Sequence, residues 1–223
     1  GNNASFYFWN TIPFRTSYVL KVKLSEIKEI ESRINNCYDC PLSKTRVKAV
    51  PGEGPDRPEI MFIGEGPGFH EDQQGRPFVG ASGKYLDHLL ASIKLKREDV
   101  FITNVVKCRP PNNRDPQEHE LEACHNHLSK QIEALHPKIL ITLGRISLSR
   151  FFPGERISNV HGKPYLRQDT TLVPMYHPAA ALHQNKMRQF IEEDFKTLPS
   201  ILAKTLTEEP VETRQIAEQP RLF

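Results

Sequence analysis

Four cysteines are the residues of this 223-residue chain whose spacing most directly indicates chemistry. Cys37 and Cys40 have the Cys-x2-Cys spacing of a metal-binding knuckle, and Cys108 and Cys124 lie far downstream. All four thiols can belong to one site, which would hold either structural zinc or an iron–sulfur cluster. The spacing does not choose between these metals, and four buried cysteines without a metal are the third interpretation. Disulfides are not expected in a reducing compartment.

Three further side chains of chemical interest stand at the ends of short apolar runs. Glu65 ends "EIMFIGE", Asn104 lies in "VFITNVV", and His177 follows "LVPMY". In an open parallel sheet the active crevice lies beyond the carboxyl ends of the strands. We therefore expect Glu65, Asn104 and His177 to meet at one rim of such a sheet. Their convergence is stronger evidence for an active site than any of the three residues alone.

The elements that would position these residues alternate along the chain. Apolar strand-like runs alternate with helix-like segments, which is typical of a mostly parallel sheet covered on both faces. We predict an α/β fold, a three-layer α/β/α sandwich with a central, mostly parallel four-stranded sheet. The predicted strands lie within 59–65, 100–106, 138–144 and 172–178, and the predicted helices within 21–34, 83–94, 116–135, 145–152 and 187–204.

Composition and charge place the chain in a broad class. It is 38% hydrophobic and 26% charged, with no apolar run of the ~18 residues that a membrane helix needs and no signal peptide. A cytoplasmic protein is the default expectation. The net charge of +3 permits an anionic partner without requiring one. We predict one domain over 21–203, an N-terminal extension of unknown role over 1–20, and a flexible polar tail over 204–223.

The glycine-rich stretches do not fit nucleotide-binding motifs. "GEGPG" lacks the spacing of G-x-G-x-x-G, and in "FVGASGKY" Phe78 stands where a P-loop has its first glycine. A tight strand-to-helix turn that allows a ligand close to the backbone is the better interpretation.

Several motifs together resemble a known family. "CYDCPLSKTR", "GEGPGFHEDQQGRPFVGASG", "TNVVKCRPPNNRDP", "LGR" and "HPAAAL" occur in the order found in the iron–sulfur (family 4) uracil-DNA glycosylases. The resemblance runs from about Cys37 to about residue 200. It implies a monofunctional DNA repair enzyme that flips uracil out of DNA, hydrolyses its N-glycosidic bond and so initiates base excision repair.

The resemblance also assigns a base pocket. Phe78 would stack on the flipped base, a contact that contributes roughly 1–3 kcal/mol. Asn104 would accept from uracil N3–H and donate to O4, a pairing that cytosine cannot satisfy. Glu71 would crowd the methyl group of thymine, and Gly66 and Pro67 would line the pocket.

Catalysis would rest on two residues. His177 would donate a hydrogen bond to uracil O2 as negative charge develops there. Glu65 is the candidate that positions or activates water, although it could instead hold its loop by accepting from backbone amides. Gly66 stands where some other uracil glycosylases have an aspartate.

The resemblance further implies a cofactor and DNA contacts. Cys37, Cys40, Cys108 and Cys124 would hold a [4Fe–4S] cluster with a structural role. Leu182 would be an apolar wedge in the minor groove. Lys107, Arg109 and Arg114 would face phosphates as salt-sensitive contacts. Ser82 and Lys163 are the remaining predicted DNA-binding residues.

Two alternative functions and one partner complete the expectations. The scaffold could be a non-catalytic DNA-binding module, or a zinc-stabilised hydrolase of another nucleotide bond. Gln219, Leu222 and Phe223 resemble the short peptide by which bacterial proteins bind the DNA sliding clamp. We expect a monomer, associated with the nucleoid and not with a membrane.

Overall fold

The computed structural model describes residues 26–207 and 214–215. Its first helix covers 26–35 in the described part, followed by a loop that contains Cys37 and Cys40. This helix agrees with the one predicted from the spacing of Ile27, Ile30 and Ile34, all of which are buried.

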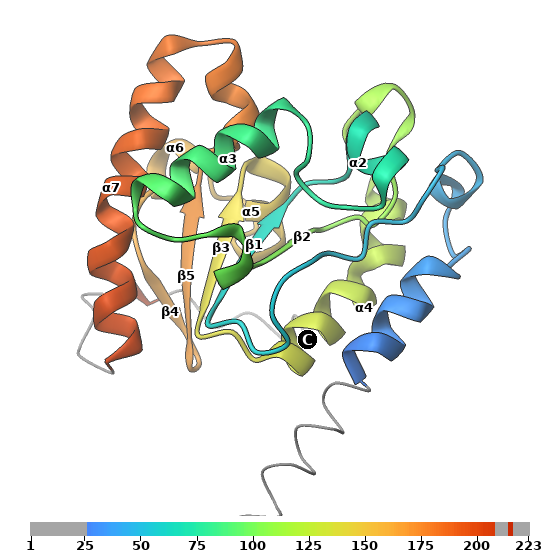
Figure 1. The fold of residues 1–223 in the computed structure, drawn as a ribbon, viewed down its shortest axis with the longest axis horizontal. Coiled ribbons are helices and arrows are strands. Elements are labelled where there is room, and N and C mark those ends of the chain that lie inside the picture. The colour runs from blue at the N-terminus through green and yellow to red at the C-terminus, as the bar shows by residue number, and fades with distance from the viewer. Residues whose placement is uncertain (1–25, 208–213, 216–223) are drawn as a thin grey trace, which may run out of the picture.

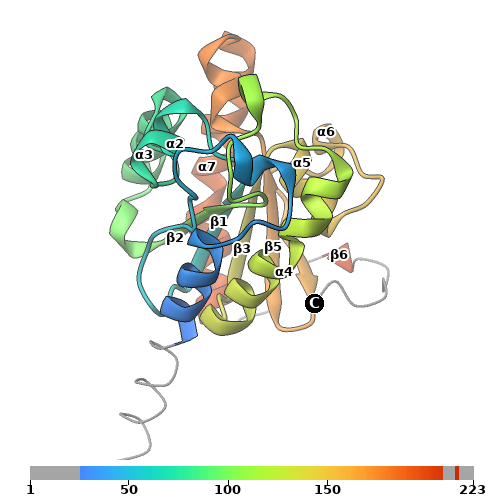
Figure 2. The ribbon, with the colours of Figure 1, turned by 90° about the vertical axis from the view of Figure 1, so that its right-hand side faces the viewer.

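A six-stranded sheet forms the centre of the described residues, in the order β2-β1-β3-β5-β4-β6. Figure 1 labels β1 to β5, and Figure 2 labels β6. Strands β2, β1, β3 and β5 are parallel, β4 is antiparallel to β5, and β6 is parallel to β4. The parallel strands are the four that the apolar runs predict, whereas β4 and β6 were missed. The strands are β1 Ile60–Gly64, β2 Phe101–Asn104, β3 Ile139–Leu143, β4 Tyr165–Arg167, β5 Thr170–Met175 and β6 Arg214–Gln215.

Helices connect the strands. Four of the six labelled α-helices match predicted segments, whereas the short α2 and α6 were not predicted. The α-helices are α2 Phe69–Gln74, α3 Ala81–Ser92, α4 Glu118–Leu135, α5 Arg145–Phe151, α6 Ile157–Val160 and α7 Asn185–Leu206, and the 3-10 helices are η1 Pro41–Lys44, η2 Arg97–Asp99, η3 Pro111–Asn113 and η4 Pro178–Leu182.

The four parallel strands are buried on both faces, which confirms the three-layer arrangement. Alternate residues of β1 point to opposite cores because side chains alternate along a strand. Met61 packs in a cluster with residues of the first helix and α4, including Ile34, while Phe62 packs with α3 and α7 and stacks on Phe195. Figures 1 and 2 show α3 and α7 on one side of the sheet, and the first helix and α4 on the other.

Only some of the predicted domain boundaries fall within the described residues. Helix α7 continues to Leu206 and β6 pairs with β4, so parts of the predicted 204–223 tail belong to the fold. The predicted extension 1–20 and the clamp-peptide residues Gln219, Leu222 and Phe223 lie outside the described residues. Among the helices that are described, none combines the length and apolar character needed to cross a membrane.

Candidate active site

A pocket of about 400 Å³ opens beyond the carboxyl ends of β1, β2 and β5. It brings together Glu65, Asn104 and His177, as the strand ends predict. The other lining residues come from the loops after β1 and β2, from the start of α3 and from η4: Gly66, Pro67, Gly68, Glu71, Phe78, Ser82, Pro110, Asn113, Arg114 and Ala179.

Asn104 ends β2 and is almost fully buried, with 1% of its surface exposed. Its Oδ1 has no hydrogen-bond partner among the described residues. Gly64, its register partner in β1, makes the close packing possible, because a Cβ there would lie 2.4 Å from Asn104 Oδ1 and 2.6 Å from Phe78 Cζ. An unpaired buried carbonyl costs about 1–3 kcal/mol, so this amide suits a ligand that supplies an N–H.

His177 lies between β5 and η4, and its ring stacks against that of Phe78 at a centroid distance of 5.6 Å. Its Nδ1 accepts from the backbone N–H of Ala179 at 3.1 Å. Burial lowers the pKa of His177 to about 4, although the charge of Glu71 opposes this shift. The ring is therefore neutral at pH 7, and with Nδ1 accepting, its proton lies on Nε2.

Glu65 has a carboxylate without a hydrogen-bond or ion-pair partner among the described residues, so it does not hold its loop. Burial raises its pKa, the charge of Asp115 adds to this effect, and Arg145 opposes it. A carboxylate with a raised pKa is a better proton acceptor than an exposed one. The neighbouring Gly66 packs closely, because a Cβ there would lie 2.7 Å from Val106 Cγ2, so a larger side chain would require Val106 to move.

Glu71, in α2, lines the pocket and holds its aromatic wall. Its Oε1 accepts from the backbone N–H groups of Val79 and Gly80 at 2.9 and 2.8 Å. Only 7% of its surface is exposed. The loop-holding role that the sequence left open for Glu65 thus falls to Glu71.

The predicted DNA contacts near the pocket are Arg109, Arg114 and Ser82, of which Arg114 and Ser82 line it. Arg114 makes two hydrogen bonds, of 2.7 and 2.8 Å, to the buried Glu120, and its side chain remains 37% exposed. Arg109 lies over the exposed ring of Phe69, with its guanidinium carbon 5.2 Å from the ring centroid.

Two predicted contacts lie outside the pocket lining. Leu182 ends η4 and is 41% exposed, one of the few large apolar side chains on the described surface. Lys163 is exposed and donates to the carbonyl of Asn159 at 3.0 Å.

The prediction that Lys107 faces DNA phosphates is wrong. Lys107 is 1% exposed, and its Nζ donates to Asn104 O, Thr103 Oγ1 and Gln131 Oε1 at 2.8, 2.7 and 2.5 Å. Burial lowers its pKa to about 7, and negative charge on Cys124 opposes this. Lys107 supports the backbone of Asn104 from beneath and is inaccessible to a phosphate.

The four cysteines gather in one corner between the first helix, η1, the end of β2 and α4. Cys108 and Cys124 are buried, whereas Cys37 and Cys40 are partly exposed. The charge of Cys108 acts on Cys37 and Cys124, and that of Cys40 acts on Cys108 and Cys124. Cys108 and Cys124 lie in the same buried cluster, and Cys40 packs against that cluster.

The surroundings of the thiols suit bound metal. Arg46 Nη1 donates to Cys108 Sγ at 3.1 Å, and the backbone N–H of Lys107 donates to Cys124 Sγ at 3.3 Å. Burial is the main cause that raises the pKa of Cys37, Cys108 and Cys124, the last to about 12. Metal ligands are thiolates, and the N–H donors on Cys108 Sγ and Cys124 Sγ stabilise negative charge on sulfur, so the four cysteines can hold an iron–sulfur cluster or zinc.

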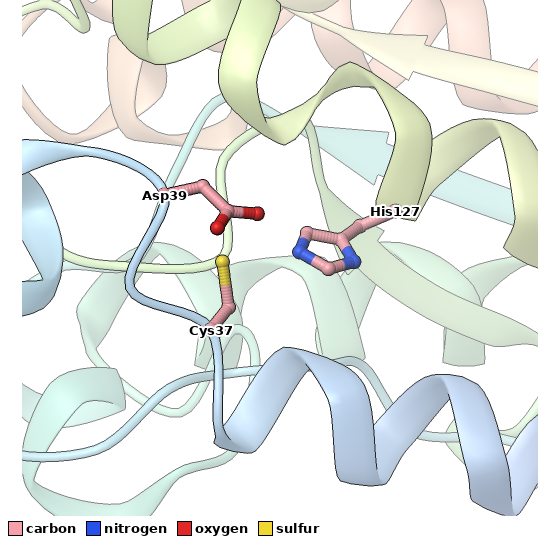
Figure 3. A group of neighbouring side chains, drawn as sticks. All are labelled: Cys37, Asp39 and His127. Atoms are coloured by element: carbon pink, nitrogen blue, oxygen red, sulfur yellow. The ribbon is translucent and has the colours of Figure 1, made fainter.

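The sequence did not indicate a role for His127 in this corner. Cys37, Asp39 and His127 offer ligand atoms that all lie within 4.8 Å of one another (Figure 3). His127 Nε2 is buried without a hydrogen-bond partner among the described residues. Its position one helical turn after Cys124 was the available signal.

Comparisons with known proteins agree with this geometry. The family model of the uracil DNA glycosylase superfamily matches residues 51–198. The type-4 uracil-DNA glycosylase of Saccharolobus solfataricus is 50% identical over 184 residues, which cover 78% of this chain and 85% of that protein. The type-4 uracil-DNA glycosylase of Sulfurisphaera tokodaii is 48% identical, over 78% of this chain and 84% of that protein. The one of Archaeoglobus fulgidus is 43% identical, over 81% of this chain and 96% of that protein.

The superfamily match spans strands β1 to β5 and every residue that lines the rim pocket. The three relatives are 43–50% identical to this chain, and each alignment covers at least 84% of the relative. The chain belongs to the type-4 uracil-DNA glycosylase family.

Proposed function

We propose that this protein is a DNA glycosylase that excises uracil by hydrolysing its N-glycosidic bond, and so initiates base excision repair. The observation that carries the proposal is the buried Asn104 carboxamide, whose Oδ1 lacks a protein partner in a pocket walled by Phe78 and His177. The names of the relatives support DNA as the substrate.

Base recognition follows from the pocket residues. Asn104 Oδ1 accepts from uracil N3–H and Nδ2 donates to O4, while the ring of Phe78 stacks on the flipped base. Cytosine presents no donor at N3 and would leave the buried Oδ1 unpaired. Glu71, fixed by its bonds to Val79 and Gly80, crowds the position of a thymine methyl group.

His177 stabilises the leaving group. As the glycosidic bond lengthens, negative charge develops on uracil O2, and the sugar becomes oxocarbenium-like. The Nε2–H of the neutral ring donates to O2, and the bond from Ala179 to Nδ1 holds the ring in that tautomer. A preorganised donor of this kind contributes about 2.7–4 kcal/mol to transition-state stabilisation.

Glu65 positions and activates the water that attacks the sugar. Its carboxylate has no protein partner among the described residues, and burial raises its pKa, so it is ready to accept a proton from water. Gly66 and Pro67 shape the same edge of the pocket.

DNA approaches the rim through Arg109, Arg114, Ser82 and Lys163, with Leu182 as the wedge that replaces the flipped base in the minor groove. The exposed position of Leu182, five residues after His177, supports this role. A DNA substrate also fits a nucleoid-associated, cytoplasmic location, and we propose a monomer as the working unit.

We further propose that Cys37, Cys40, Cys108 and Cys124 hold a [4Fe–4S] cluster. When bound, the cluster supplies iron–thiolate bonds that fix the loop after the first helix to α4 and to the segment after β2. Uracil excision has no net redox change, so the role is structural. Iron and sulfide at about four of each per chain support this cofactor, whereas about two of each, or zinc as the metal present, would overturn it.

The sliding-clamp contact through Gln219, Leu222 and Phe223 stays a prediction. Deletion of 219–223 should abolish retention of the protein on immobilised clamp. Unchanged retention, or none with the intact chain, would reject this partner.

The test of the proposed activity is excision from labelled oligonucleotides that contain one uracil, thymine or cytosine at the same position. We expect alkali-labile cleavage at uracil only, with a rate reduced about 10²–10³-fold in His177→Ala. Binding without cleavage by a cluster-loaded preparation would favour the non-catalytic DNA-binding module, and cleavage of another nucleotide bond would favour a different hydrolase.

A further inference from the structure

Phe78, the aromatic wall of the pocket, has an unusual backbone conformation. Its φ is +50°, in the left-handed region that non-glycine residues rarely adopt. The following helix accommodates it only because residue 83 is glycine, since a Cβ there would lie 1.9 Å from the carbonyl oxygen of Phe78. Such a conformation persists where surrounding contacts fix it.

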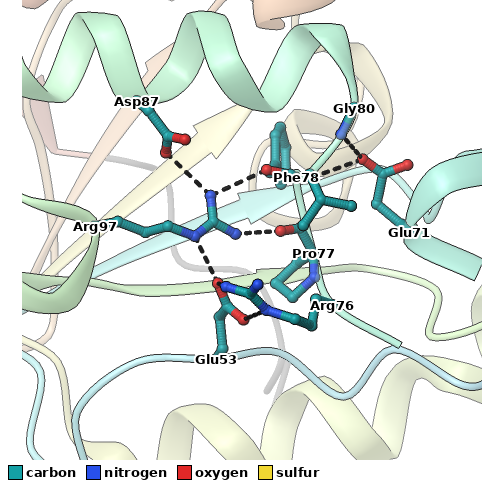
Figure 4. Close-up of polar contacts among 9 residues, drawn as sticks. Glu53, Glu71, Arg76, Pro77, Phe78, Gly80, Asp87 and Arg97 are labelled. Atoms are coloured by element: carbon teal, nitrogen blue, oxygen red, sulfur yellow. Dashed lines mark hydrogen bonds and ion pairs between the residues drawn. The ribbon is translucent and has the colours of Figure 1, made fainter. Parts of the chain in front are cut away.

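Two charged side chains fix this turn from opposite sides (Figure 4). Glu71 accepts from the amides of Val79 and Gly80. Arg97, at the start of η2, donates from Nη1 to the carbonyl of Phe78 at 3.0 Å and from Nη2 to the carbonyl of Pro77. Four polar groups of consecutive residues are thus bound by one carboxylate and one guanidinium.

Arg97 is itself held in place. Its Nε donates to Glu53 Oε1 at 2.5 Å, its Nη1 donates to Asp87 at 3.1 Å, and its side chain is only 20% exposed. Burial opposes ionisation of Glu53, but the hydrogen bonds from Arg76 and Arg97 outweigh it and lower the pKa of Glu53. Glu53 is therefore ionised at neutral pH.

Glu53 connects this network to the strand that carries Asn104. Its backbone N–H and C=O both pair with Ile102 of β2, at 3.0 and 2.8 Å. Ile102 lies two residues before Asn104. The chain of contacts therefore runs from β2 through Glu53 and Arg97 to the backbone of Phe78.

We propose that Arg97 is a positioning residue that sets the distance and angle between the base-stacking ring of Phe78 and the base-reading amide of Asn104. The inference rests on the proposed function for its effect on uracil, but the contact between Arg97 and the turn does not. Arg97 touches no substrate, and it acts through the two carbonyls that it binds. A lysine at this position has no planar fork and reaches one carbonyl at most.

Arg76 offers a matched control. It also binds Glu53, at 2.8 and 3.1 Å, but its side chain is 57% exposed and it contacts neither carbonyl of the turn. Arg76→Gln therefore removes a charge from the same carboxylate without releasing Phe78.

The experiment compares wild type, Arg97→Gln, Arg97→Lys and Arg76→Gln. Three quantities are measured: hydrogen exchange at the amides of Val79 and Gly80, the single-turnover rate of uracil excision, and the inhibition constant of free uracil. For Arg97→Gln we expect exchange at least tenfold faster, excision at least tenfold slower, and an inhibition constant raised at least fivefold. Arg97→Lys should lie between Arg97→Gln and wild type, and Arg76→Gln should stay within twofold of wild type.

A merely structural role would lower the melting temperature and the fraction of active enzyme without changing the inhibition constant of that fraction. Exchange and inhibition by uracil both within twofold of wild type in Arg97→Gln would overturn the inference, and if that variant does not fold, the same limits apply to Arg97→Lys. Faster exchange in a protein whose wild type does not excise uracil would retain the positioning contact and reject the proposed function.

Discussion

The rim pocket and the cysteine corner differ in how their polar groups are satisfied. Around the pocket, the turn that carries Phe78 has its carbonyls and amides bound by Arg97 and Glu71. In the cysteine corner, burial raises the pKa of three thiols and His127 Nε2 has no partner among the described residues.

This difference indicates two kinds of preorganisation. Protein contacts alone hold the pocket. Among the described residues that line it, Asn104 Oδ1 is the one buried polar side-chain atom without a hydrogen-bond partner. A ligand with an N–H can therefore bind without rearranging the walls. The cysteine corner gathers four thiols, which are the proposed ligands of a metal-containing group.

The largest structural effect is expected when two of the proposed metal ligands are replaced. In the double variant Cys37→Ser and Cys40→Ser, we expect loss of the visible absorbance of the proposed cluster and at least tenfold faster hydrogen exchange in the loop 36–50. Exchange in β1 and β3 should change little, because these strands pack in both cores. Equal acceleration throughout the sheet would show that the two regions are not separable.

Lys107→Met tests the link between the two regions. The substitution removes the donor of three buried acceptors, among them the carbonyl of Asn104. We expect a loss of about 2–4 kcal/mol in the free energy of unfolding, measured by urea denaturation, together with slower excision. The salt dependence of DNA binding should not change, and a decrease in its slope would restore Lys107 as a phosphate contact.

The pH dependence of stability tests the neutral state of His177. Its pKa is about 4 in the folded protein and about 6.5 when unfolded, so the unfolded state binds a proton first as the pH falls. Stability is therefore lost between pH 7 and pH 4. Between pH 7 and pH 5, wild type should lose about 2 kcal/mol more than His177→Gln. Parallel pH profiles of the two proteins would contradict a depressed pKa.

The smallest effect concerns the outer edge of the pocket. Arg109→Gln should weaken DNA binding and reduce the slope of log affinity against log salt by about 1, because one phosphate contact is lost. Excision at saturating enzyme should be unchanged. A slope equal to that of wild type would remove Arg109 from the DNA interface.

The four parallel strands and the long helices were predictable because their apolar residues recur with a clear period. The short elements β4, β6, α2 and α6 give too few residues for a periodic signal. Glu65, Asn104 and His177 were predictable as a group because the carboxyl ends of parallel strands meet.

Other site residues were not predictable from their types. A lysine among basic neighbours is usually exposed, but Lys107 continues a buried run after β2 and lies over Gln131. Glu53 and Arg97 are 44 residues apart, and each is an ordinary charged loop residue in the sequence. Only the fold brings them to the turn at Phe78.

The most direct test of the central claim compares two asparagines of the same pocket. Asn104 is buried at its floor, whereas Asn113 is exposed and accepts from Arg109 at 2.7 Å. The measurement is the single-turnover rate of uracil excision. We predict a decrease of at least 10²-fold for Asn104→Ala and less than threefold for Asn113→Ala. Equal rates in the two variants would contradict recognition of uracil by Asn104.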